Sequence, residues 1–351
     1  MHTLQTPCTI PNMATTLRDV AAHAGVSIRT VSNVVSGYTH VSTDTRNRVL
    51  ASIAELDYHA NPVARTLRTG RTGVLLLAVP EIDVPYFSEL AKEVIRAAAA
   101  HAYSITITQT NDIEPSSDRH FDKRAVLYDG ILFASHTTLR TPPPIAASPS
   151  TPIVLLGEDA TNEAHDRVAI DNVLASYEAT THIISLGRKR IGVIGTQPQL
   201  DFSTPAHRFA GYCKALADAG IAFDQTLVAP TAHYSREAGY EAAHSLLTAD
   251  HTIDAIVCFS DLLAIGALRA VKDLSRSIPD DVSIVGIDDI PEGRFSTPSL
   301  TTVSLDIASI ASNSIRLLLS RLEDPNRPPE EFTAPHRLII RESCGGLDHR
   351  N

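Results

Sequence analysis

Residues 16–70 restrict most strongly the fold that this chain can adopt. Residues that favour helix starts, and a glycine that favours a helix end, occur there at short, regular spacings. Thr16 precedes a run with helical apolar periodicity, and Asp19 follows three residues later, as in a capping box. Gly25 is expected to end this helix, because glycine adopts a positive φ at little steric cost. The stretch therefore predicts a first helix of about two turns.

A second and a third helix are expected to follow. Ser27 is a favourable cap for a helix over residues 28–36, and two short helices around a glycine-containing turn are typical of a helix-turn-helix unit. The third helix is expected over residues 43–56. Its apolar face, which would close a small core, consists of Val49, Ile53 and Leu56. We therefore expect a three-helix DNA-binding domain over residues 14–60.

The distribution of charge separates this head from the rest of the chain. The whole sequence has a net charge of −10, whereas residues 14–71 hold seven arginines and four acidic residues, a net of +3. Residues 1–13 contain no Lys, Arg, Asp or Glu, so the chain from residue 72 onward carries −13. A basic head on an acidic body is expected when only the head meets the phosphates of DNA.

A marginal helix is expected in the hinge, residues 61–72, between the head and the body. Asn61 and Pro62 suit the cap and the first position of a helix that would reach Arg68. Because a helix of about two turns is marginal in water, it should fold only where DNA or a second copy of the chain supplies contacts. Leu67 would then act as an apolar wedge at a minor-groove base step.

The composition and the absence of several motifs argue against other classes of function, such as metal-binding, enzymatic and membrane proteins. The four cysteines are widely scattered and predict free thiols: Cys8, Cys213, Cys258 and Cys344. The sequence has no HExxH, P-loop, GxGxxG or GxSxG motif, so we expect no metal, no cofactor and no enzymatic activity. The absence of a long apolar run and of a signal peptide predicts a cytoplasmic protein without a membrane partner. Residues 1–13 are expected to be a disordered tail, unless Met13 is the true start.

From residue 73 onward, short apolar runs alternate with helical stretches. Strands are expected over residues 74–79, 104–109, 130–134, 153–156, 190–194, 255–259 and 282–287, and helices over residues 87–100, 172–186 and 208–219. Repeated strand–helix units predict parallel sheets covered by helices, and about 270 residues of them favour two lobes. Ligands of such folds bind at the carboxyl ends of strands, here in the cleft between the lobes.

Residues 16–70 resemble, without gaps, the head and hinge of the lactose/galactose-repressor family of bacterial transcription regulators. The similarity includes TLRDVAAHAGVS at residues 16–27, Tyr58, and the hinge pattern from Asn61 to Leu67. The resemblance implies that the second helix enters the major groove, with Ile28, Arg29 and Asn33 at the base-reading positions. Asn33 stands where several members carry Arg, which shifts the expected base from guanine towards adenine. Further contacts to DNA are implied for Thr16, Ser27, Thr30, Ser32, His40, Thr45, Asn61, Ala64 and Leu67.

The body resembles the effector-binding domain of the same family, a two-lobed α/β fold of the periplasmic-binding-protein type. The matching motifs include PYF at 85–87, RFAGY at 208–212 and VGIDD at 285–289. An effector-binding and dimerisation domain is implied over residues 73–351, with a first lobe of about 73–171 and 304–333 and a second of about 172–303 and 334–343. The implied effector contacts are Tyr86, Phe87, Asp171, Arg208, Tyr234, Ser260 and Asp288. Residues 111–125 and the proline-rich stretch 141–150 fit the family poorly, so the edge of the first lobe is expected to be remodelled.

Several alternatives stay open at this point. Arg208 and Asp288 would each bind a pair of vicinal hydroxyls, or they would form an ion pair that closes the lobes. Phe87 is as well suited to the core as to a ligand.

The leading hypothesis is a dimeric, or alternatively tetrameric, repressor of carbohydrate-utilisation genes. It would bind a pseudo-palindromic operator under the control of a sugar-like effector. A purine or nucleoside effector is the alternative. A solute-binding protein without a DNA role and a Rossmann-type enzyme are the competing classes.

Overall fold

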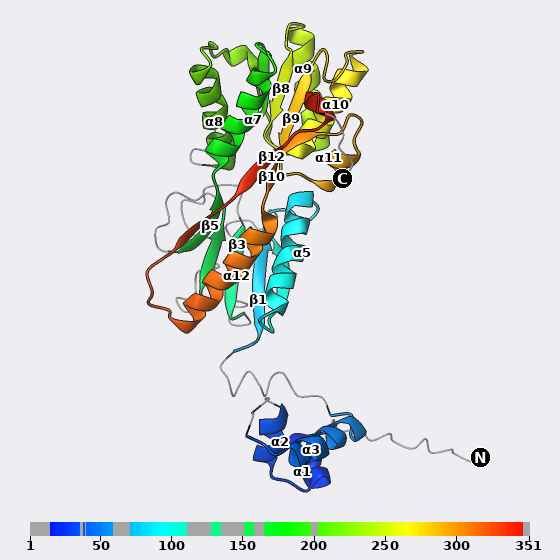
Figure 1. Cartoon of the computed structure of the whole chain (residues 1–351), viewed down its shortest axis with the longest axis vertical. Helices are drawn as coiled ribbons and strands as arrows, with labels where there is room; N and C mark the ends of the chain where they lie inside the picture. Colours follow the sequence, from blue (N-terminus) through cyan, green and yellow to red (C-terminus); the bar gives the residue numbers. More distant parts are fainter. Residues whose placement is uncertain are drawn as a thin grey trace, which may run out of the picture. The chain divides into compact units, whose positions relative to one another are not determined.

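In the computed structural model the chain forms two compact units, residues 1–72 and residues 73–351 (Figure 1). The structure describes residues 15–35, 38, 40–58, 71–110, 128–134, 151–157, 165–197 and 203–346. The expected tail (1–13), the expected hinge helix with Asn61, Ala64 and Leu67, and the stretches 111–125 and 141–150 lie outside the described residues. Those expectations therefore stay predictions.

The described part of the first unit contains three helices, α1 (Leu17–Ala24), α2 (Ile28–Val35) and α3 (Thr43–Glu55). The capping box is present: the Asp19 amide donates to the Thr16 hydroxyl, and the Thr16 amide donates to the Asp19 carboxylate at 2.9 Å. Gly25 ends α1 with a φ of +65°. The Thr30 amide donates to Ser27 Oγ at 3.1 Å, so Ser27 caps α2. These contacts confirm the predicted starts of α1 and α2.

A small apolar core holds the three helices together. Val20 of α1, Val31 of α2 and Val49 of α3 are fully buried, and Ile53 and Leu56 pack against them. Each fully buried valine contributes roughly 1.5–3 kcal/mol relative to an exposed one. The apolar face predicted for the third helix is therefore confirmed. In α2, only Val31 and Val34 are buried, so the opposite side of this helix does not take part in the core.

Among the described residues of the second unit, the strands form two six-stranded sheets. The first has the order β11-β5-β4-β3-β1-β2 and the second the order β12-β10-β9-β8-β6-β7. All neighbouring strands pair in parallel except β10 and β12. The strands of the first sheet are β1 (Val74–Val79), β2 (Ser104–Gln109), β3 (Gly130–Ala134), β4 (Ile153–Leu156), β5 (Asp166–Ile170) and β11 (Glu331–Ala334). Those of the second are β6 (Ile191–Thr196), β7 (Val228–Pro230), β8 (Ala255–Cys258), β9 (Ser283–Ile287), β10 (Thr301–Leu305) and β12 (His336–Ile339).

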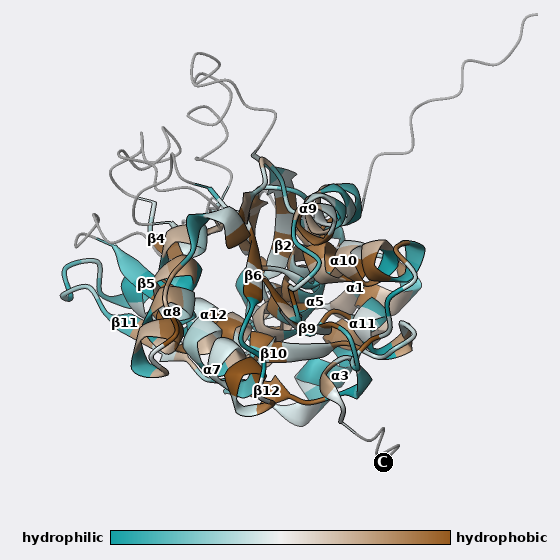
Figure 2. Cartoon of the chain, turned by 90° about the horizontal axis from the view of Figure 1, so that it is seen from above, coloured by the Kyte–Doolittle hydropathy of each residue, from teal (hydrophilic) through white to brown (hydrophobic). Residues whose placement is uncertain are grey.

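Helices cover both sheets in pairs. In the first lobe, α5 (Pro85–Ala99) packs beside α12 (Ile307–Glu323) (Figure 1). In the second lobe, α7 (Asn172–Ser185) pairs with α8 (Thr204–Asp218), and α9 (Arg236–Ala249) pairs with α10 (Asp261–Asp273). Strands such as β6 are therefore buried along their whole length, and β6 is predominantly hydrophobic in Figure 2. The short elements are α11 (Pro291–Phe295), η4 (Gln225–Leu227) and η5 (Glu342–Cys344).

Three crossings join the lobes, after β5, after β10 and after β11. The Asp306 amide donates to the Pro335 carbonyl at 3.2 Å, so two crossings lie side by side. Strand β10 of the second sheet ends at Leu305, and strand β11 of the first sheet ends at Ala334. The last two crossings therefore lie one or two residues beyond the expected boundaries near 304 and 334.

Two helices begin earlier than the periodicity indicated. Proline at the first helical position allows α5 to begin at Pro85, and Ser203 caps α8 so that it begins at Thr204. The earlier start puts Arg208 in the second turn of α8. Gly211 brings this helix close to α7, because a Cβ there would lie 2.2 Å from the Val173 carbonyl oxygen.

Candidate functional site

A cavity of about 460 Å³ lies between the carboxyl ends of the two sheets. In the first lobe its lining includes Ala134 at the end of β3 and Leu156 at the end of β4. In the second lobe it includes Ser260, after β8, and Asp288, after β9. This is the position where parallel α/β sheets bind ligands, and the volume suits a small organic molecule.

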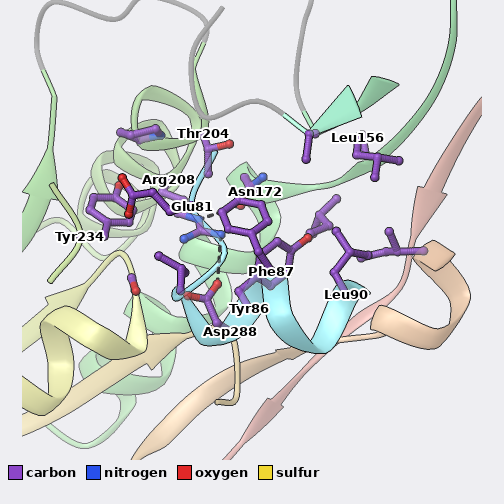
Figure 3. Close-up of a pocket in the computed structure, with 18 of the residues that line it drawn as sticks. Glu81, Tyr86, Phe87, Leu90, Leu156, Asn172, Thr204, Arg208, Tyr234 and Asp288 are labelled. Carbon is purple, nitrogen blue, oxygen red and sulfur yellow. Dashed lines mark hydrogen bonds and ion pairs between the residues drawn. The ribbon is translucent and has the colours of Figure 1, made fainter. Parts of the chain in front are cut away.

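Arg208 is the central charged group of the cavity and is only 5% exposed. Its Nε donates to Asn172 Oδ1 at 2.7 Å, and its Nη1 donates to the Phe259 carbonyl oxygen. Its Nη2 lies 3.6 Å from Asp288 Oδ1 (Figure 3). The idea that this ion pair closes the lobes is wrong, because α8 and β9 both belong to the second lobe.

Asp288 presents a carboxylate with a side-chain exposure of 12% from a strained turn. Its φ is +123° and that of Asp289 is +53°, values that residues other than glycine rarely adopt. Burial raises the pKa of Asp288 to about 6, although the Arg208 guanidinium and the Ser260 hydroxyl oppose the shift. At neutral pH, Asp288 is therefore mainly ionised and able to accept hydrogen bonds from a ligand.

Three consecutive backbone amides anchor this turn. The Asp288 amide donates to the Val303 carbonyl at 2.9 Å, and the Asp289 amide donates to Thr302 Oγ1 at 3.3 Å. The Ile290 amide donates to Asp261 Oδ2 at 3.0 Å. The three bonds account for two successive positive φ values, because the surroundings fix the backbone there.

Aromatic rings complete the lining. Tyr86 and Phe87 lie in the first turn of α5, with ring centroids 5.1 Å apart in an edge-to-face arrangement. The Tyr234 hydroxyl donates to the Gly195 carbonyl at 2.9 Å. Burial raises the pKa of Tyr86 and Tyr234 above the ordinary tyrosine range, so both hydroxyls stay neutral.

The expected effector residues are largely gathered at this cavity. Its lining contains Tyr86, Phe87, Arg208, Tyr234, Ser260 and Asp288. Asp171 is not part of that lining; its carboxylate accepts the Leu174 amide at 2.8 Å and caps α7. Its neighbour Asn172 lines the cavity instead and holds Arg208.

Sequence reasoning missed several lining residues: Glu81, Asn172, Gln197, Thr204 and His233. Of these, Asn172 could have been found, because it directly follows the expected lobe crossing.

In the head, α2 presents two different sides. Val31 and Val34 face the core, whereas Ile28 is 45% exposed and Arg29 is also exposed. Residues 28, 29, 32 and 33 share one side of a helix because they are spaced by one and four positions. The three expected base-reading residues therefore lie on the side away from the core.

Three of the residues expected to contact the DNA backbone lie at helix starts. Thr16 and Ser27 cap α1 and α2, and the Thr45 amide donates to Ser42 at the start of α3. Helix N-termini carry partial positive charge, which suits phosphate oxygens. His40 is exposed, with its ring 5.4 Å from that of Tyr38, an exposed aromatic that sequence reasoning missed.

A three-helix DNA-reading head joined to a two-lobed α/β domain with a ligand cavity defines a ligand-responsive transcription regulator. Residues 16–61 match the family of bacterial regulatory proteins called the lacI family, and residues 180–344 match a periplasmic binding protein-like domain.

The chain is 32% identical over 345 residues to the HTH-type transcriptional regulator DegA of Bacillus subtilis (strain 168), covering 96% of this chain and 100% of that protein. It is 30% identical over 334 residues to the HTH-type transcriptional repressor PurR of Histophilus somni (strain 2336), covering 95% and 99%. A solved complex of the transcriptional regulator CelR with cellobiose has a TM-score of 0.72 at 28% identity, covering 94% and 99%. The chain therefore belongs to the lacI family of bacterial transcription regulators.

These relatives are transcription regulators, which are not enzymes. Across the described ranges, every helix is too short or too polar to cross a membrane.

Proposed function

We propose that this regulator is a cytoplasmic, dimeric repressor of carbohydrate-utilisation genes whose DNA affinity is set by a sugar-like effector. The observation that carries the proposal is the pair formed by Arg208 and Asp288 at 3.6 Å, buried in a cavity with aromatic walls. A cationic donor beside an anionic acceptor matches two adjacent hydroxyls, and aromatic faces match the C–H side of a sugar ring. CelR, the relative solved with cellobiose, is consistent with this class of ligand.

The proposal assigns two groups of residues on the DNA side. Ile28, Arg29 and Asn33 read bases in the major groove. Contacts to the backbone and the minor groove come from Thr16, Ser27, Thr30, Ser32, His40, Thr45, Asn61, Ala64 and Leu67. We assign residues 14–60 to the head, 61–72 to the hinge and 73–351 to effector binding and dimerisation.

The order of the head, the hinge and the two lobes along the chain provides a way to couple effector binding to DNA binding. Ligand contacts come from both lobes, so binding favours a particular closure of the lobes about the three crossings. The hinge leads directly into β1 of the first lobe, and in a dimer a change of closure alters the spacing of the two hinges.

Selection from a random pool of DNA duplexes tests the DNA half of the proposal. The full chain should enrich a pseudo-palindrome, with affinity that falls steeply as salt rises. Asn33→Arg should shift one base of each half-site from adenine towards guanine. Asn47→Arg adds the same charge on an exposed position of α3 and should leave the selected sequence unchanged. Failure to enrich any sequence at low salt would overturn the proposal.

Calorimetry with free sugars, glycosides and purines tests the effector half. Sugar binding that is lost in Asp288→Asn and retained in Asp171→Asn supports the proposal, because only Asp288 lines the cavity. Binding of purines alone would favour the alternative effector class.

A further inference from the structure

We propose that Asp129 is a positioning residue for DNA binding, because its carboxylate fixes the backbone at Gly73, the first residue after the hinge. Asp129 directly precedes β3 and lies 56 positions from Gly73 along the chain. The inference rests on the proposed role of residues 61–72 as a hinge that contacts DNA. It adds the group in the first lobe that determines how the chain passes from the hinge into β1.

Three hydrogen bonds hold the chain where β1 begins. The Gly73 amide donates to Asp129 Oδ2 at 2.9 Å, and the Gly73 carbonyl accepts from the Ser104 amide at 3.0 Å. The Asp129 amide donates to the Val74 carbonyl at 2.8 Å. These contacts come from β2 on one side of β1 and from the start of β3 on the other, so the start of β1 is held from both neighbouring strands.

The backbone conformation of Gly73 makes the carboxylate important. Gly73 has a φ of +74°, and a Cβ on it would have no atom within 4 Å, so glycine is required for its conformation and not for space. A glycine without a partner for its amide can adopt many conformations, each of which sends the preceding residues in a different direction. An acceptor with a full negative charge gives the amide a strong hydrogen bond and selects one of them.

The anchor belongs to the rigid part of the first lobe. Strand β3, which follows Asp129, is buried along its whole length. Its first residue, Gly130, lies close to α12, because a Cβ there would be 2.8 Å from Leu318 Cδ1. Helix α12 packs along β3 (Figure 1) and also lines the cavity through Ile310. Asp129 therefore moves with the lobe that an effector would contact, and Gly73 passes the orientation of that lobe to the hinge.

The second lobe repeats the same anchor away from the hinge. Asp254 directly precedes β8, as Asp129 precedes β3. Its carboxylate accepts from the Lys189 amide at 2.9 Å and from the Arg190 amide at 3.0 Å, just before β6. Its own amide donates to the Arg190 carbonyl at 3.0 Å. Because the chain reaches β6 from α7 and not from the hinge, Asp254 offers a control with the same contact and no DNA-binding segment next to it.

The operator affinity of full-length variants tests this inference. The duplex is the sequence that the parent chain selects from a random pool, and binding is measured by fluorescence anisotropy at one fixed salt concentration. Asp129→Ala should weaken binding about tenfold or more, because only a fraction of the molecules would hold the hinge in a binding-competent direction. Asp129→Asn keeps an acceptor oxygen for the Gly73 amide and should bind within about threefold of the parent. Asp254→Ala, the control, should also bind within about threefold of the parent.

Gly73→Ala tests the same position without removing the carboxylate, and it replaces Asp129→Ala if that variant does not fold. A methyl group has room there but disfavours a positive φ, so operator binding should weaken at least about threefold. Amide exchange provides a local measurement. In Asp129→Ala the amides of Gly73 and Ser104 should exchange faster than in the parent, whereas the amides of α1 in the head should exchange at the parent rate.

The outcomes separate this inference from the proposed function. Loss of operator affinity in Asp129→Ala and Gly73→Ala, but not in Asp254→Ala, would support the inference. Operator binding by Asp129→Ala at the parent affinity would overturn it and leave the proposed regulator intact. An equal loss in Asp129→Ala and Asp254→Ala would also overturn it, because the effect would then come from the general stability of a lobe. A parent chain that selects no DNA would defeat the proposed function, and this inference would fail with it.

Discussion

Replacing Asp261 by asparagine should stabilise this protein near neutral pH. Asp261 is the first residue of α10 and is fully buried. Its carboxylate oxygens meet two neutral groups, the Thr302 hydroxyl at 2.6 Å and the Ile290 amide at 3.0 Å. Burial, together with the nearby charge of Asp288, raises the pKa of Asp261 to about 8.

The size of the effect follows from this pKa. The unfolded chain releases the proton near pH 3.8 and the folded chain near pH 8, so the folded state binds more protons between these values. Stability is therefore lost as pH rises from about 4 to about 8 and levels off above that. At pH 7 the folded protein has lost stability over roughly three pH units, which corresponds to about 4 kcal/mol.

The N-terminus of α10 favours the ionised form of Asp261, but this stabilisation is weaker than the cost of burying the charge. The N-terminus of α10 favours a negative charge by about 0.3–1 kcal/mol, and up to about 2 kcal/mol in buried settings. Taking an isolated carboxylate out of water costs several kcal/mol, so protonation prevails. Thr302 Oγ1 donates to Asp261 Oδ1, and the Ile290 amide donates to Oδ2. A hydroxyl both donates and accepts, so it can turn to accept from the protonated acid, and asparagine would meet Thr302 with its NH₂ group and the Ile290 amide with its carbonyl.

Chemical unfolding of Asp261→Asn and the parent chain at pH 5, 7 and 9 measures the difference. We expect the free energy of unfolding of Asp261→Asn to exceed that of the parent chain by an amount that grows from pH 5 to pH 7. Because the amide reproduces the hydrogen bonds of the acid imperfectly, this difference should reach about 2–4 kcal/mol. Asp261→Ala should destabilise at every pH, because it leaves the Ile290 amide without its acceptor. A difference between Asp261→Asn and the parent that does not vary with pH would refute the reasoning, since it would mean that Asp261 is ionised in the folded protein.

Three further predictions concern the cavity, the packing and the head. Effector binding should weaken as pH falls through about 6, because protonation of Asp288 removes the acceptor; a flat calorimetric profile from pH 5 to 8 would contradict this. Gly211→Ala should lower the unfolding free energy by about 1–3 kcal/mol and weaken effector binding, because the new Cβ would press on the Val173 carbonyl and move α8, which carries Arg208. Thr16→Ala should destabilise the head by about 1 kcal/mol through loss of the cap, seen as faster amide exchange in α1, whereas Thr16→Ser should exchange at the parent rate.

Local signals in the sequence predicted the elements well. Capping residues and a glycine placed α1 and α2, and apolar runs such as residues 130–134 and 153–156 placed the central strands. The expected ranges did not include strands β5, β7, β10 and β11 or helices α9, α10 and α12. Strand β7 has only three residues, which end in proline, and is too short to show a period. Strands are predicted most reliably where every residue is buried, as in the central strands, because such strands appear in the sequence as continuous apolar runs.

The candidate site was harder to predict because its contacts join distant parts of the chain. Arg208 is held by Asn172, 36 residues away, and by the Phe259 carbonyl, 51 residues away. An arginine beside a known motif suggested binding, but only the folded chain shows which of its nitrogens faces Asp288. Asp171 illustrates the opposite error, because a carboxylate at a lobe crossing suits a helix cap as well as a ligand contact.

Buried Asp261 helps to hold in place the side chain of Asp288, the proposed effector contact. A Cβ on Gly286 would lie 2.1 Å from Asp261 Oδ1, so β9 admits the acid only because glycine occupies that position. The neutral acid then fixes the Ile290 amide, two residues beyond Asp288, within a turn that would otherwise relax from its positive φ values. If this anchor were lost, as in Asp261→Ala, the turn would be held only by the Asp288 and Asp289 amides, which donate to the Val303 carbonyl and to Thr302 Oγ1. Asp261 is therefore placed to act on the proposed effector site through the backbone, because it holds the turn that carries Asp288.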